Sequence, residues 1–107
     1  MSGDEHYFNS REFSRGAVSI PAEIREKGAG RQKVSVIDLS RSGFRMNCIF
    51  LIPPDRTVFL TMEGFESLEA RIAWHDDDYY GCEFKQRLHE AVYDHVINTY
   101  PLLGRRR

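Results

Sequence analysis

Residues 32–48 read QKVSVIDLSRSGFRMNC, two alternating segments joined by a short polar turn. Apolar and polar residues alternate over residues 33–36, within the predicted strand 32–37, and again over residues 44–48. Because neighbouring side chains of a β-strand point to opposite faces, this alternation is typical of strands that are buried on one face. The turn between them has the pattern D-x-S-x-x-G, from Asp38 to Gly43. The stretch therefore predicts two strands that meet at a polar turn.

The same alternation recurs along most of the chain. It predicts further strands over residues 18–24, 58–62, 68–74 and 80–84, with turns at residues 28–30, 63–64 and 75–78. Pro21 has no N–H to donate to a neighbouring strand, so we expect it at a sheet edge or a bulge. Six short strands with regular turns predict a mainly β fold. We expect a six-stranded antiparallel barrel, which closes on itself and leaves no open sheet edge.

The period changes near the C-terminal end. From residue 88 onward, apolar residues follow helical spacing, and Pro101 ends the pattern. The residues predicted to share one face of this helix are Leu88, Ala91, Val92, His95, Val96 and Tyr100. We expect the helix to cover one mouth of the barrel. The chain then divides into a flexible arm (1–16), a barrel with its helix (17–100) and a basic tail (101–107).

The composition is that of one ordinary globular domain, with 107 residues, 41% hydrophobic and 29% charged. No apolar run approaches the roughly 20 residues of a membrane helix, and the first residues lack the features of a signal peptide. We therefore expect a cytoplasmic protein that does not insert into a membrane. The two cysteines, Cys48 and Cys82, lie in alternating segments and are expected to be buried free thiols.

Charge is distributed unevenly. Residues 1–45 contain eight Lys/Arg and six Asp/Glu, whereas residues 46–107 contain seven Lys/Arg and ten Asp/Glu, which gives the net charge of −1. A general DNA or RNA binder is usually basic overall, so neither nucleic acid is expected as a partner. The excess of positive charge in the first part suits a small anion held by a few arginines.

Two arginines precede the first strand in the pattern R-x-x-x-R, Arg11 and Arg15. A guanidinium offers forked donors that suit phosphate oxygens and the O6/N7 edge of guanine. The turn adds Asp38, which accepts hydrogen bonds from ring N–H and amino groups, and Gly43, where a backbone can approach a ligand closely. Together these groups could bind one planar anionic ligand.

The order and spacing of these motifs resemble the PilZ-domain family of small bacterial β-barrels that bind cyclic di-GMP. The similarity covers roughly residues 11–100 and includes the strand end Ala73-Trp74 and the run Gly81-Cys82-Glu83-Phe84. It implies that an arm carrying Arg11 and Arg15 wraps the ligand against the barrel.

The resemblance also implies roles for the turn. Asp38 would accept from the Watson–Crick edge of a guanine, Ser40 would donate to a phosphate or base, and Gly43 would allow a tight turn. Arg41 is a further candidate as a cation near the phosphates, and Trp74 as an apolar wall or stacking surface. Family members often carry another arginine just before the first motif arginine, where this chain has Ser10.

Simpler interpretations compete for each feature taken alone. The arginine pair could belong to a solvated arm, Asp38 to Gly43 could form an ordinary turn, and Trp74 could pack in the core or at the barrel rim. The acidic turn that begins at His75 suits solvent better than a metal, because consecutive acidic residues point in different directions. No nucleophile has a credible base, so we expect no enzyme.

The sequence thus predicts a receptor module for cyclic di-GMP that orders its arm on binding and signals to a protein partner. The alternative is an interaction module that needs no ligand and docks through the arm or the terminal helix. An RNA-binding barrel is a third possibility, but it would call for several exposed aromatic residues among basic ones.

Overall fold

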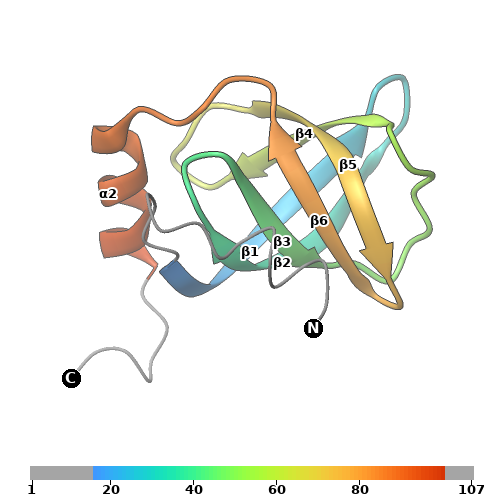
Figure 1. Ribbon diagram of the computed structural model, residues 1–107, viewed down its shortest axis with the longest axis horizontal. Helices are drawn as coiled ribbons and strands as arrows, with labels where there is room; N and C mark the ends of the chain where they lie inside the picture. Colours follow the sequence, from blue (N-terminus) through green and yellow to red (C-terminus); the bar gives the residue numbers. More distant parts are fainter. Residues whose placement is uncertain (1–15, 101–107) are drawn as a thin grey trace.

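The computed structural model describes residues 16–100, which form a closed antiparallel β-barrel with one helix. The strands pair around the barrel in the order β1-β2-β3-β6-β5-β4, and β1 closes on β4 (Figure 1). Their bounds are β1 Gly16–Glu26, β2 Arg31–Leu39, β3 Gly43–Asn47, β4 Thr57–Met62, β5 Leu68–Asp76 and β6 Tyr79–Phe84, and the helix α2 spans Glu90–Thr99.

This architecture confirms the fold expected from the sequence. Each predicted strand is present, and its ends differ from the predicted ones by no more than a few residues. The predicted turns at Gly28 and Gly64 form with φ angles of 81° and 89°, in the left-handed region that favours glycine. Gly16, which we assigned to the arm, is the first residue of β1.

Pro21 lies where β1 loses one of its neighbours. It pairs with Ser35 of β2, whereas the pairing of β1 with β4 begins one residue later, at Ala22 and Met62. The missing N–H of Pro21 is therefore tolerated at the margin of the β1–β4 ladder.

The barrel interior is filled by the apolar half of each alternating strand. Its largest fully buried side chains come from all six strands and from the loop after β3: Tyr80, Phe44, Ile20, Ile24, Leu39, Met46, Ile52, Leu60, Met62, Ile72, Val36 and Val58. Cys48 and Cys82 belong to the same core and are free thiols, as expected. Burial in this apolar interior raises the pKa of the Cys82 thiol well above its usual range, and nearby Cys48 adds to the effect.

Helix α2 lies across one end of the barrel, beside the β2–β3 and β4–β5 turns (Figure 1). Val96 is fully buried, and Tyr93, Ile97 and Tyr100 pack against the core. The Tyr100 hydroxyl donates to the Glu63 carbonyl in the β4–β5 turn, at 3.0 Å. The helix therefore covers one mouth of the barrel, as the sequence predicted.

The face that α2 buries differs in part from the predicted one. Ala91, Val92 and His95 are exposed, whereas Tyr93 and Ile97 turn towards the barrel. The helix begins only at Glu90, with His89 as its N-cap, so Leu88 reaches the core from the preceding loop and not from the helical stripe. Because the predicted face included Leu88 as a helical residue, that face is rotated about the helix axis relative to the one that α2 buries. Within residues 16–100, no helix is long and apolar enough to cross a membrane.

The loop after β3 exposes three consecutive apolar residues, Ile49, Phe50 and Leu51, at the end of the barrel opposite α2 (Figure 1). Ile49 and Leu51 are 76% and 77% exposed. The backbone of this loop is nevertheless hydrogen-bonded to the core. The buried Tyr80 hydroxyl donates to the Phe50 carbonyl at 2.8 Å and accepts from the Ile52 N–H at 3.0 Å. The loop is fixed to the core even though its side chains face solvent.

Candidate functional site

The D-x-S-x-x-G turn is organised around the hydroxyl of Ser40. This oxygen accepts from the backbone N–H groups of Ser42 and Gly43, both at 3.2 Å, and lies 3.3 Å from the Gly43 carbonyl and 3.1 Å from the Ser42 hydroxyl. The Ser40 N–H also donates to the Gly43 carbonyl at 2.9 Å. Ser40 is 4% exposed, so its side chain stabilises the turn from within.

Arg41 connects the turn to the segment that leads into α2. Its Nε donates to the Leu88 carbonyl at 2.9 Å, and the Leu88 N–H donates to the Arg41 carbonyl at 2.8 Å. These reciprocal bonds link two segments that are 47 residues apart in the chain. Arg41 therefore positions the entry to the helix, a role that its place in the motif did not predict.

Gly43 does not have the special backbone conformation that its place in the turn suggested. It is the first residue of β3, and the positive φ angles among the glycines of residues 16–100 belong to Gly28 and Gly64. Gly43 is buried and pairs with Glu83 of β6. Its backbone already belongs to the strand ladder.

Four backbone positions form one row across the outside of the barrel. In successive strands, Asp38 pairs with Arg45, Arg45 with Gly81, and Gly81 with Trp74. The adjacent pairs Leu39–Phe44 and Phe44–Cys82 are fully buried in the core. Because side chains alternate along a strand, the row faces the other side, away from the core.

Two β-bulges create this row. The register shifts between Val36 and Asp38 in the pairing of β2 with β3, and between Ile72 and Trp74 in the pairing of β5 with β6. Each shift adds one residue to one strand and moves the residues after it to the other face. Without the shift, Asp38 would share the core-facing side of Val36, and Trp74 that of Ile72.

Trp74 therefore lies outside the core. Strict alternation along its strand would instead have placed it on the core-facing side with Ile72. Its indole is half-buried on the outer face and lies over Gly81, where a Cβ atom would be 2.0 Å from its Nε1. The indole N–H is buried and has no hydrogen-bond partner within residues 16–100. The ring thus covers a position at which only glycine leaves space.

Arg45 belongs to the same row and pairs with Asp38, although the sequence did not single it out. Its Nη2 lies 2.6 Å from Asp38 Oδ2, and the side chains of Arg45 and Asp38 are 26% and 4% exposed. In the sequence, Arg45 was only the polar partner of Phe44 in an alternating strand. The register of the two strands on either side of the turn could have identified it, because pairing β2 with β3 places Arg45 opposite Asp38.

The structure brings five of the seven predicted residues into one region at the β2–β3 turn and the adjacent outer face: Asp38, Ser40, Arg41, Gly43 and Trp74. Arg11 and Arg15 lie outside the described residues. The region combines a nearly buried carboxylate, a guanidinium and an aromatic ring. These groups can pair with a polar base edge, attract an anion and support a planar ring.

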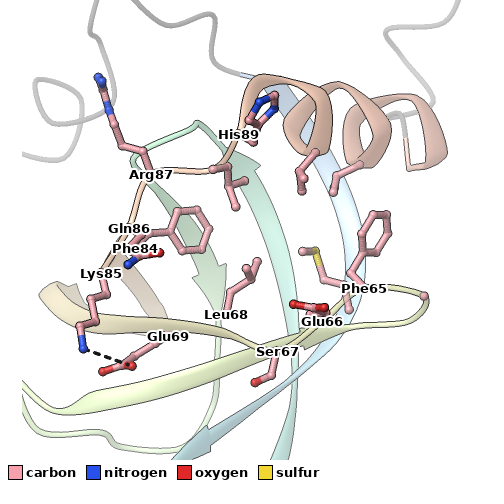
Figure 2. A pocket seen from close by; sticks show the side chains of 15 residues that line it. Phe65, Glu66, Ser67, Leu68, Glu69, Phe84, Lys85, Gln86, Arg87 and His89 are labelled. Carbon is pink, nitrogen blue, oxygen red and sulfur yellow. Dashed lines mark ion pairs between the residues drawn. The ribbon is translucent and has the colours of Figure 1, made fainter.

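A separate groove of about 700 Å³ lies between α2 and the barrel. Figure 2 shows Phe65, Leu68 and Phe84 pointing into it, whereas Arg87 extends away from it. At its margin, Lys85 Nζ lies 3.8 Å from Glu69 Oε1. The groove is mainly apolar at its floor and contains none of the predicted ligand-binding residues.

Within residues 16–100, no three His, Cys, Asp or Glu side chains are placed to hold a metal ion. His75, which was expected to begin the acidic turn, belongs to β5 and stacks on Tyr80, with ring centroids 4.2 Å apart.

Comparison with known proteins identifies the family. The PilZ domain matches residues 9–99, most of the chain. The fold is similar to the crystal structure of the PilZ domain of CeSA from a cellulose-synthesizing bacterium, with a TM-score of 0.60 and 18% sequence identity over 79% of this chain and 93% of that one. No curated protein matches the sequence. The chain belongs to the PilZ domain family, a family of cyclic di-GMP-binding modules.

Proposed function

We propose that this protein is a receptor module that binds cyclic di-GMP on the outer face of its barrel. The observation that carries the proposal is the row that joins Asp38, Arg45, Gly81 and Trp74 across four strands. A carboxylate, a guanidinium and an aromatic ring thereby share one wall of the barrel, and these groups suit a guanine edge, a phosphate and a planar base. Membership of the PilZ domain family supports this ligand over other planar anions.

The chemistry of the ligand suits these groups. A guanine presents N–H donors on its Watson–Crick edge that a carboxylate can accept, and its ring can rest on an indole. The phosphates require forked cationic donors, which Arg11 and Arg15 of the arm would supply in this proposal. Binding would then order the arm on the barrel and change the surface that a protein partner meets.

The protein contains a single tryptophan, Trp74, which provides a direct test. We expect titration with cyclic di-GMP to change its fluorescence saturably, whereas GTP and cyclic di-AMP at the same concentration leave it unchanged. An Asp38→Asn variant should lose the response. Equal responses to all three nucleotides would contradict specific recognition of cyclic di-GMP.

Ordering of the arm needs a separate experiment. Limited proteolysis should cut within residues 9–16 of the free protein and cut more slowly when cyclic di-GMP is bound. Equal cleavage with and without a saturating ligand would rule out the ordering step and leave binding itself intact.

A second candidate is an interaction module that works without a ligand. The groove between α2 and the barrel favours it, because the apolar side chains at its floor can accept an apolar segment of a partner and its charged margin can pair with polar flanks. Under this alternative, Asp38→Asn would leave association with the partner unchanged, whereas a charge placed in the groove, Leu68→Glu, would abolish it.

A further inference from the structure

We propose that Arg45 is a positioning residue that sets base specificity by holding the Asp38 carboxylate ready for both donors of a guanine edge. The inference rests on the proposed function, since it concerns the same site. It assigns a role to a residue that lies outside both sequence motifs, D-x-S-x-x-G and R-x-x-x-R.

The contact between the two side chains is short and shielded. Arg45 Nη2 lies 2.6 Å from Asp38 Oδ2, and the Asp38 side chain is 4% exposed. A charge-assisted bond in such a place is stronger and better oriented than one between solvated groups. The guanidinium therefore fixes the rotation of the carboxylate as well as balancing its charge.

The barrel places both residues independently of any flexible loop. Asp38 and Arg45 are directly paired in the β2–β3 ladder, on the two sides of the turn that Ser40 closes. The bulge before Asp38 turns its side chain to the outer face, and Arg45 meets it there. Sites built on strands hold their geometry better than sites built on loops.

Orientation matters because guanine offers two parallel donors, N1–H and the N2 amino group. A carboxylate accepts both only when its two oxygens lie in the plane of the base. The terminal torsion of an aspartate is broad, so a carboxylate without a fixed partner would satisfy one donor at a time. Arg45 should therefore contribute most to the second hydrogen bond, which distinguishes guanine from a base without the amino group.

Cyclic di-IMP provides the test, because hypoxanthine keeps N1–H but lacks the 2-amino group. We expect the wild-type protein to bind cyclic di-GMP about tenfold or more tightly than cyclic di-IMP, the contribution of one charged hydrogen bond. In Arg45→Met this ratio should fall below about threefold, and Arg45→Lys, which keeps the charge but not the fork, should lie between them.

The matched control is Arg31→Met, which removes the same charge from an exposed position near the start of β2. It should keep the wild-type ratio. Circular dichroism of each variant verifies that the barrel is folded before its affinities are compared. If Arg45 had a purely structural role, its substitution would weaken the binding of both ligands equally and leave the ratio of the two affinities unchanged.

Two outcomes separate the inference from the function on which it rests. If Arg45→Met and Arg45→Lys bind both ligands with the wild-type ratio, the positioning role of Arg45 is wrong and the receptor function stands. If the wild-type protein binds neither cyclic dinucleotide, the proposed function fails, and the inference fails with it.

Discussion

The indole of Trp74 occupies the space above Gly81 in which any other residue would place its Cβ atom. A Cβ built there would lie 2.0 Å from Trp74 Nε1 and 2.2 Å from Cε2 of the same ring. The two residues pair across β5 and β6, so the close approach is set by the backbone ladder. Glycine at position 81 is thus required for the aromatic part of the candidate site.

Gly81→Ala should therefore displace the indole. We expect a shift in the emission of this single tryptophan, weaker binding of cyclic di-GMP and a loss of about 1–3 kcal/mol in the free energy of unfolding, the range for overpacking. Gly30→Ala is the control, because a Cβ there meets nothing within 4 Å. Unchanged emission and affinity in Gly81→Ala would show that the ring does not depend on this glycine.

Ser40→Ala should destabilise the polar turn. The hydroxyl satisfies two backbone N–H groups, and its loss leaves buried donors without that acceptor. The expected decrease in the free energy of unfolding is about 1–3 kcal/mol, measured by urea denaturation. Ser42→Ala, at a more exposed position of the same turn, should cost less; an equal or larger cost would contradict the central role of Ser40.

Arg41→Ala should loosen the connection between β6 and α2. The variant loses the bond from Arg41 Nε to the Leu88 carbonyl, although the backbone bond from Leu88 to Arg41 can remain. We expect faster amide hydrogen exchange over residues 85–92 and a decrease of about 1–2 kcal/mol in the free energy of unfolding. Exchange that matches the wild type throughout this segment would refute the connection.

Stability should fall at alkaline pH. Burial raises the pKa of Cys82 and of the Tyr80 hydroxyl in the folded state. The unfolded chain releases these protons first, at about pH 8.5 for the thiol and about pH 10 for the phenol. The stabilising contribution is therefore complete below about pH 8.5 and is lost as the pH rises above it.

Urea denaturation at several pH values tests this expectation. Cys82→Ala should reduce the slope of stability against pH between about 8.5 and 10, whatever its effect on absolute stability. The native thiols should also react slowly with a thiol reagent at pH 8, because Cys48 and Cys82 are both buried. Rapid labelling of the folded protein would contradict their burial.

The sequence predicted the barrel well because its information is local. Alternation specified which side of each strand is apolar, and the turn glycines marked where strands end. It could not predict the bulges, since one extra residue in β2 or β5 leaves no distinct mark in composition. Asp38 was selected by its motif and Trp74 by the family resemblance, but strict alternation along β5 would have put Trp74 on the same side as Ile72.

Arg45 shows the other limit of the sequence argument. Its partner Asp38 lies seven residues away, and their contact depends on the register that the turn and the bulge set together. The predicted face of α2 was wrong in part for a similar reason. Leu88 contacts the core from the loop before the helix, and a hydrogen bond from Arg41 holds that loop in place. These placements arise from tertiary contacts and not from local periodicity.

Isothermal titration of the full chain with cyclic di-GMP tests the central claim most directly, with Asp38→Asn measured alongside. We predict saturable heat for the wild-type protein and an affinity at least about tenfold weaker for the variant, as expected when a charged hydrogen-bond acceptor is lost. No heat for the wild type, together with an unchanged melting temperature at high ligand concentration, would contradict the receptor function.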